Sequence, residues 1–259
     1  MFEDLFFNFL ESEENKDNNY PDYFYLWDDA LSENTTHDSL EPEELKDIIN
    51  IYFSEEELEK ARITIDYTLS TYQDEEDILY DIMVILSDYE KWNDLLKLAE
   101  QLKDRNEFWV DAHKIEALLH LSMEEEAFQT FQTAKTKYAK ETESMSILYL
   151  AMGESLLEMD LFESCIDVIS EAIDKFGPQI DFYWLQIEAN ATINDIEEVY
   201  SLAEKISELI PFDASSWQRL GLIYKQINDT SKAIEAFEFA RNLEYEDKQR
   251  NLLELIFAY

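Results

Sequence analysis

The stretch ASSWQRLGLIYKQINDTSKAIEAFEFA, residues 214–240, decides the fold. Its apolar residues fall at helical spacing on both sides of a polar break, Asn228-Asp229-Thr230. These three residue types favour a turn followed by the N-cap of a new helix. The stretch therefore predicts two amphipathic helices that pack against each other.

The two predicted helices resemble one tetratricopeptide repeat. The family pattern has an aromatic residue at position 4, Leu-Gly at 7 and 8, Tyr at 11, then Ala, Phe and Ala at 20, 24 and 27. Small residues at 8 and 20 let the helices approach closely, and large ones fill the space that is left. The family's Pro at position 32 is replaced by Tyr245, and the other positions are filled by Trp217, Leu220, Gly221, Tyr224, Ala233, Phe237 and Ala240.

The pattern recurs towards the amino terminus at intervals of 34 residues, as repeat proteins require. One step back, Tyr183 takes position 4, and two steps back Tyr149 does. Pro211 and Gly177-Pro178 end these two units, because proline does not continue a helix. Earlier units are more degenerate. The predicted units are 42–75, 76–107, 108–145, 146–179, 180–213 and 214–247.

The resemblance implies an all-α fold, a right-handed α-α superhelix of the tetratricopeptide-like solenoid type over 42–247, with capping helices at both ends. Another α-solenoid or an irregular helical array is the competing interpretation. The acidic and aromatic segment 1–41 is predicted to form two short helices, about 2–13 and 21–31, that cap the first repeat. Its alternative is to lie in the concave groove. Residues 248–259 are predicted to be a capping helix, or else a self-association or partner surface.

The net charge of the chain limits the kinds of partner that it can bind. The chain has 60 acidic and 20 basic residues among its 259, a formal net charge of −40. Such a charge repels nucleic acid and anionic membrane surfaces and suits a basic protein. The amino terminus lacks the features of a signal peptide, and no apolar run reaches membrane-spanning length. We therefore expect a cytoplasmic protein with neither nucleic acid nor membrane as partner.

Catalytic motifs are missing. The chain has no Gly-rich phosphate loop, and its single cysteine, Cys165, occupies the small-residue position 20, which predicts a buried thiol. His113, Glu116 and His120 share one helix face, but three residues on one helix do not specify a metal site. We predict no enzymatic activity, no cofactor and no metal.

The resemblance also implies where a partner would bind. In this family, positions 2, 5, 9 and 12 of each first helix face the groove. Two of the tryptophans at such positions, Trp109 and Trp184, are either anchors for a peptide or packed between neighbouring repeats. The lining is acidic and aromatic, which argues against a Lys- and Arg-based carboxylate clamp. The predicted groove residues are Tyr80, Trp109, Glu116, Glu154, Trp184, Glu188, Gln218 and Lys225.

From these features we predict a non-catalytic scaffold or adaptor that binds a protein or peptide segment, basic or amphipathic, in the acidic-aromatic groove. The alternative is a structural or self-assembling scaffold that forms homo-oligomers through its carboxyl-terminal helix.

Overall fold

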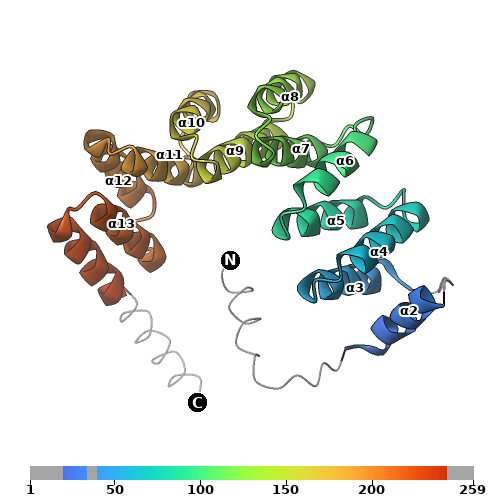
Figure 1. Ribbon diagram of the computed structural model, residues 1–259. Helices are drawn as coiled ribbons and strands as arrows, with labels where there is room; N and C mark the ends of the chain where they lie inside the picture. Colours follow the sequence, from blue (N-terminus) through green and yellow to red (C-terminus); the bar gives the residue numbers. More distant parts are fainter. Residues whose placement is uncertain (1–19, 34–39, 244–259) are drawn as a thin grey trace, which may run out of the picture. The chain divides into compact units, whose positions relative to one another are not determined.

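The computed structural model describes residues 20–33 and 40–243 (Figure 1). All regular secondary structure in these two ranges is helical. The predicted helices at about 2–13 and at 248–259 lie outside them, whereas the one predicted at about 21–31 is confirmed. A helix of residues 230–243 follows the last labelled one. The labelled helices are α2 (Asp22–Ser32), α3 (Pro42–Ser54), α4 (Leu58–Thr71), α5 (Glu76–Asp88), α6 (Trp92–Gln101), α7 (Phe108–His120), α8 (Glu124–Lys137), α9 (Thr142–Glu158), α10 (Phe162–Phe176), α11 (Ile180–Thr192), α12 (Ile196–Leu209) and α13 (Ala214–Gln226).

The chain divides after Tyr89 into two compact units. The first contains α2 to α5, and the second contains α6 to α13 with the helix of residues 230–243. In the second unit, each helix packs against the next or the next but one. The division falls inside the predicted unit 76–107, and the predicted unit boundaries stay a prediction.

One backbone feature recurs along both units. A residue with positive φ ends an α-helical turn at Glu56, Glu90, Ser122, Asp160, Asn194 and Asn228, at intervals of 34, 32, 38, 34 and 34 residues. The left-handed conformation closes the helix, because the next amide can then reach back to a carbonyl in the last turn. Asp229 N–H, for example, donates to the Tyr224 carbonyl at 2.8 Å. Helix-turn-helix pairs therefore repeat throughout the described chain, and the all-α solenoid prediction is confirmed.

Replacing one of these left-handed residues tests the assignment. Glu56 has φ 61°, a conformation that costs a β-carbon-bearing residue free energy and glycine little. Glu56→Gly is expected to raise the free energy of unfolding by about 0.5–1 kcal/mol, measured by urea denaturation. Glu59→Gly, in the first turn of α4, is the control and is expected to lower it by a similar amount. A loss of stability with both variants would contradict the turn geometry.

Helices approach each other closely at the repeat's small positions. A β-carbon placed on Gly221 would lie 2.5 Å from a ring carbon of Phe237, and one on Gly153 would lie 2.5 Å from Ile169. Cys165, at position 20, is fully buried, as predicted. Burial, with a smaller contribution from the charge of Glu188, raises the pKa of its thiol to about 12. Position 20 is therefore a packing position, and its thiol stays protonated at neutral pH.

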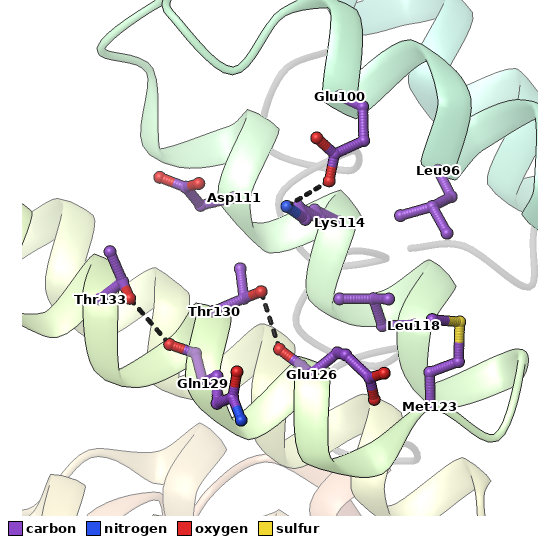
Figure 2. Close-up of a pocket in the computed structure, with 10 residues that line it drawn as sticks. All are labelled: Leu96, Glu100, Asp111, Lys114, Leu118, Met123, Glu126, Gln129, Thr130 and Thr133. Carbon is purple, nitrogen blue, oxygen red and sulfur yellow. Dashed lines mark hydrogen bonds and ion pairs between the residues drawn. The ribbon is translucent and has the colours of Figure 1, made fainter.

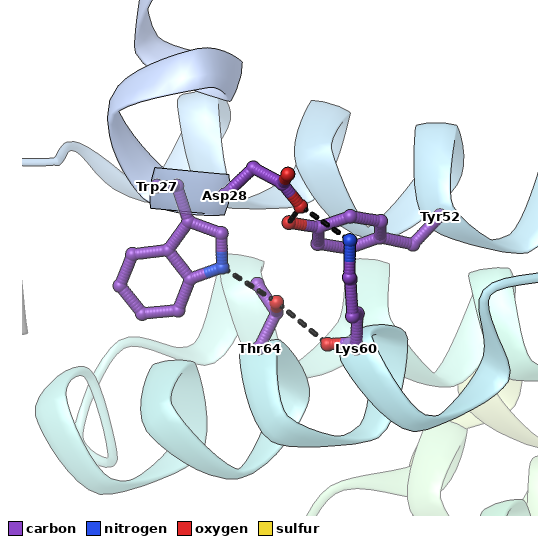
Figure 3. Close-up of polar contacts among 5 residues, drawn as sticks. All are labelled: Trp27, Asp28, Tyr52, Lys60 and Thr64. Carbon is purple, nitrogen blue, oxygen red and sulfur yellow. Dashed lines mark hydrogen bonds and ion pairs between the residues drawn. The ribbon is translucent and has the colours of Figure 1, made fainter. Parts of the chain in front are cut away.

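Trp27 and Asp28 connect helix α2 to α3 and α4 (Figure 3). Trp27 is 1% exposed, and its indole N–H donates to Thr64 Oγ1 at 2.8 Å. Asp28 accepts from the Tyr52 hydroxyl at 2.8 Å and from the Lys60 ammonium at 2.7 Å. The segment before the first helix pair thus covers an apolar surface of that pair.

Asp28 makes part of this docking dependent on pH. Burial alone would raise its pKa, but hydrogen bonds from Lys60 and Tyr52 and the charge of Lys60 outweigh it, and the pKa is lowered. A carboxyl whose pKa is lowered by folding stabilises the protein above its unfolded-state pKa. That contribution is lost as the pH falls through the folded-state pKa.

The variant Asp28→Asn is therefore expected to be less stable than the native chain at about pH 7, with the difference shrinking towards about pH 3. Urea unfolding at both pH values measures it. An equal difference at the two pH values would show that the ionised carboxylate contributes nothing.

Candidate protein-binding surface

Carboxylates from three successive odd-numbered helices gather in the second unit. We define the acidic strip as Glu116 on α7, Glu154 and Glu158 on α9, and Asp181 on α11. Helix α9 contacts both α7 and α11 (Figure 1), and Glu116, Glu158 and Asp181 lie close enough to Glu154 for their charges to act on it. Partial desolvation, followed by the charges of Glu158, Asp181 and Glu116, raises the pKa of Glu154. The strip is therefore a place where negative charges are crowded.

The repeat places these carboxylates together. Position 9 of the repeat is glutamate in three consecutive units, at Glu116, Glu154 and Glu188. Glu154 and Glu158 are one helical turn apart on α9, so they share a face. Like charges at such spacing destabilise each other, and a nearby cation relieves the repulsion. A charge pattern of this kind is unfavourable in the free protein and becomes favourable with a cationic partner.

Histidines accompany the strip. His113 Nδ1 lies 3.0 Å from Glu116, and His120 Nε2 lies 3.3 Å from Glu158. The His120 ring stacks on Trp92, with centroids 3.9 Å apart. The two histidines therefore face different carboxylates. Over residues 20–33 and 40–243, no group of three or more His, Cys, Asp or Glu side chains is placed to hold a metal ion.

Trp184 is a core residue. It is 6% exposed and packs in the cluster that includes Ile187 and Leu220. The guanidinium carbon of Arg219 lies 4.3 Å from the centre of its ring, and Arg219 Nε donates to Glu188 at 2.8 Å. Of the two interpretations of this tryptophan, packing between neighbouring helices is the one that the structure shows.

Arg219 was absent from the predicted site residues, although it caps Trp184 and neutralises Glu188. The repeat spacing carries a signal for this contact, because position 6 of one repeat faces position 9 of the preceding one, 31 residues earlier in the sequence. Trp109, the second predicted anchor, is half-buried on α7.

The remaining predicted residues are spread more widely. Gln218 and Lys225 are exposed on α13, beside Leu222, which is 57% exposed. Tyr80 is 44% exposed on α5, in the first unit. The structure therefore gathers Glu116 and Glu154, pairs Glu188 internally, and leaves the groove role of the others as a prediction.

None of the helices in the described part of the chain is both long and apolar enough to cross a membrane.

No protein-family model and no curated protein sequence matches the chain. Among solved structures, a tetratricopeptide repeat protein from Parabacteroides merdae is similar, with a TM-score of 0.49 and 11% identity over 76% of this chain and 77% of that one. MamA from Desulfovibrio magneticus is similar with a TM-score of 0.48 and 16% identity, over 67% of this chain and 97% of that one. Likenesses this distant carry no function from those proteins to this chain.

Proposed function

We propose that this chain is a non-catalytic scaffold that binds a basic segment of another protein along the acidic strip. The observation that carries the proposal is the crowding of carboxylates around Glu154, whose pKa is raised by desolvation and by three neighbouring acidic side chains. A surface that holds like charges together gains free energy when a cation binds. The formal net charge of −40 adds long-range attraction for a basic partner.

Arg219 supplies an internal example of the proposed contact. Its guanidinium pairs with the position-9 glutamate of the preceding repeat, Glu188, and lies over an aromatic ring. Guanidinium groups suit this geometry because they are planar and bind carboxylates in a fork. An arginine or lysine of a partner segment would meet Glu154, also at position 9, in the same way.

The binding test uses peptides selected from a random display library on the native protein. We expect the selected peptides to be enriched in lysine and arginine. The double variant Glu154→Lys and Glu158→Lys should weaken their binding by about tenfold or more, since several like-charge contacts replace attractive ones. Added salt should weaken binding to the native protein.

A matched control is available on α12. Glu204 and Glu208 are also exposed glutamates one turn apart, so Glu204→Lys with Glu208→Lys changes the net charge equally. We expect this control to retain most of the affinity. If both double variants lose the same affinity for the peptides, binding depends only on the overall charge, and a local site is refuted. Selected peptides without basic residues would refute the basic partner.

The alternative, self-association through residues 248–259, involves residues outside the described ranges and stays a prediction. Light scattering before and after removal of residues 248–259 tests it, and an unchanged monomer would exclude it.

A further inference from the structure

A pocket of about 430 Å³ opens between α6, α7 and α8 in the second unit (Figure 2). Its volume lies in the range of sites that take small ligands or anchoring side chains. It is lined by Leu96, Glu100, Asp111, Lys114, Leu118, Met123, Glu126, Gln129, Thr130 and Thr133. We call it the α7 pocket. Its α7 residues, Asp111, Lys114 and Leu118, lie on one face of the helix. Glu116 of the acidic strip lies on the opposite face.

The pocket exists because one repeat departs from the packing pattern. In this repeat Asp111 takes position 4 and Lys114 takes position 7. A carboxylate and an ammonium that turn aside towards partners do not fill the space that large uncharged side chains fill in the following repeats. Position 4 in the three following repeats is Tyr149, Tyr183 and Trp217, and the residues at position 7 are Met152, Gln186 and Leu220.

The two polar replacements point away from each other. Lys114 Nζ pairs with Glu100 of α6 at 2.5 Å. Asp111 accepts from the Tyr138 hydroxyl at 2.8 Å and from the Lys137 ammonium at 3.0 Å, both at the carboxyl end of α8. Figure 2 shows Lys114 directed to Glu100, with Asp111 and Leu96 at opposite sides of the view. Each of the two charged side chains is therefore fixed by an ion pair.

One end of the pocket is apolar and has a carboxylate beside it. Leu96, Leu118 and Met123 form this end, and Glu126 extends next to Met123 (Figure 2). Lys114 is already paired with Glu100, so it does not neutralise Glu126. Three carboxylates and one ammonium line the pocket in total. An aliphatic stem that ends in a cation fits this combination, since the stem covers the apolar end and the cation meets Glu126.

We propose that the α7 pocket binds a lysine or arginine side chain of a partner segment, with its stem against Leu96, Leu118 and Met123 and its charged group at Glu126. The site goes beyond the acidic strip and lies on the other side of α7, so either site can fail its test while the other passes. The excess of carboxylates in the lining disfavours an anionic ligand.

The experiment follows the Met123 methyl group by NMR in protein labelled with ¹³C-methyl methionine, with Met123→Leu identifying the signal. The probe is Nα-acetyl-lysine methylamide, and Nα-acetyl-norleucine methylamide is the same stem without the ammonium group. We expect the lysine probe to shift the signal saturably, with an affinity on the order of millimolar, and the norleucine probe to bind several-fold more weakly.

Two variants test whether Glu126 is the carboxylate that binds the ammonium group of the probe. Glu126→Gln is expected to weaken the lysine probe by about fivefold and to leave the norleucine probe unchanged. Glu124→Gln is the matched control, at an exposed glutamate of the same helix that does not line the pocket, and should leave both probes unchanged. Equal binding of the two probes, equal effects of the two variants, or no shift of the Met123 signal would each overturn the proposal.

Discussion

Trp27→Ala is expected to lower the free energy of unfolding of the first unit by about 3–5 kcal/mol. The indole is 1% exposed, lies 4.7 Å from the ring of Tyr67 between centroids, and donates its N–H to Thr64. Alanine would remove most of the side chain and leave a cavity between α2 and α4.

Urea unfolding measures this change in the free energy of unfolding, and two further variants of α2 serve as comparisons. Leu26→Ala removes a side chain that is 49% exposed and should cost less than about 1 kcal/mol. Trp27→Phe keeps an aromatic ring but loses the hydrogen bond to Thr64, so its cost should be intermediate. If Trp27→Ala costs no more than Leu26→Ala, α2 does not cover the first helix pair.

Phe131→Ala is expected to lower the stability of the second unit by about 3–5 kcal/mol. Phe131 occupies position 24 of its repeat and is fully buried. Its ring meets Tyr149 edge-on, with centroids 5.0 Å apart, and the ammonium of Lys135 lies 5.2 Å from its centre. The residue therefore joins the helix pair α7/α8 to α9, and its loss weakens contacts on both sides.

Thermal or urea unfolding followed by circular dichroism checks the Phe131 prediction. Gln132→Ala, exposed on the same helix, is the control and should change stability by less than about 0.5 kcal/mol. Phe131→Leu should be milder than Phe131→Ala because it retains most of the apolar volume. A loss below about 1 kcal/mol for Phe131→Ala would contradict the packing of α8 on α9.

The helix pairs were predictable because their packing depends on local pattern. Gly221 and Phe237 are 16 residues apart in sequence, and the repeat alone predicts that one must be small where the other is large. The same reasoning placed Cys165 in the core. Position 20 is small at Ala127, Cys165 and Ala233 alike, so these units support one another's interpretation.

The partnerships of polar side chains were harder to predict. The family pattern gives Trp184 a groove position, yet Arg219 from the next repeat covers its ring and ties up Glu188. Position 9 is glutamate at Glu116, Glu154 and Glu188 alike, and the sequence pattern does not show which of them pairs with a residue of the next repeat. That depends on side chains one repeat away.

The sequence contains a signal for the α7 pocket, although the repeat pattern alone does not predict it. Asp111 stands at a position that is aromatic in the three following repeats, and Lys114 is the charged residue at a position that is otherwise uncharged there. A buried charge needs a partner, and a side chain that turns towards its partner leaves space at the packing position. Asp111 and Lys114 do both. The division after Tyr89 has no comparable signal, because no linker composition marks it.

The most direct test of the acidic strip is carboxyl-carbon NMR of the full chain during titration with an octapeptide of alternating lysine and alanine. The account predicts that the resonances of Glu154, Glu158 and Asp181 shift first and in proportion, while those of Glu204 and Glu208 remain in place. It also predicts that added salt reverses the shifts. Equal shifts at Glu204 and Glu208 would show unspecific attraction to a highly charged chain and would contradict a binding surface on α7, α9 and α11.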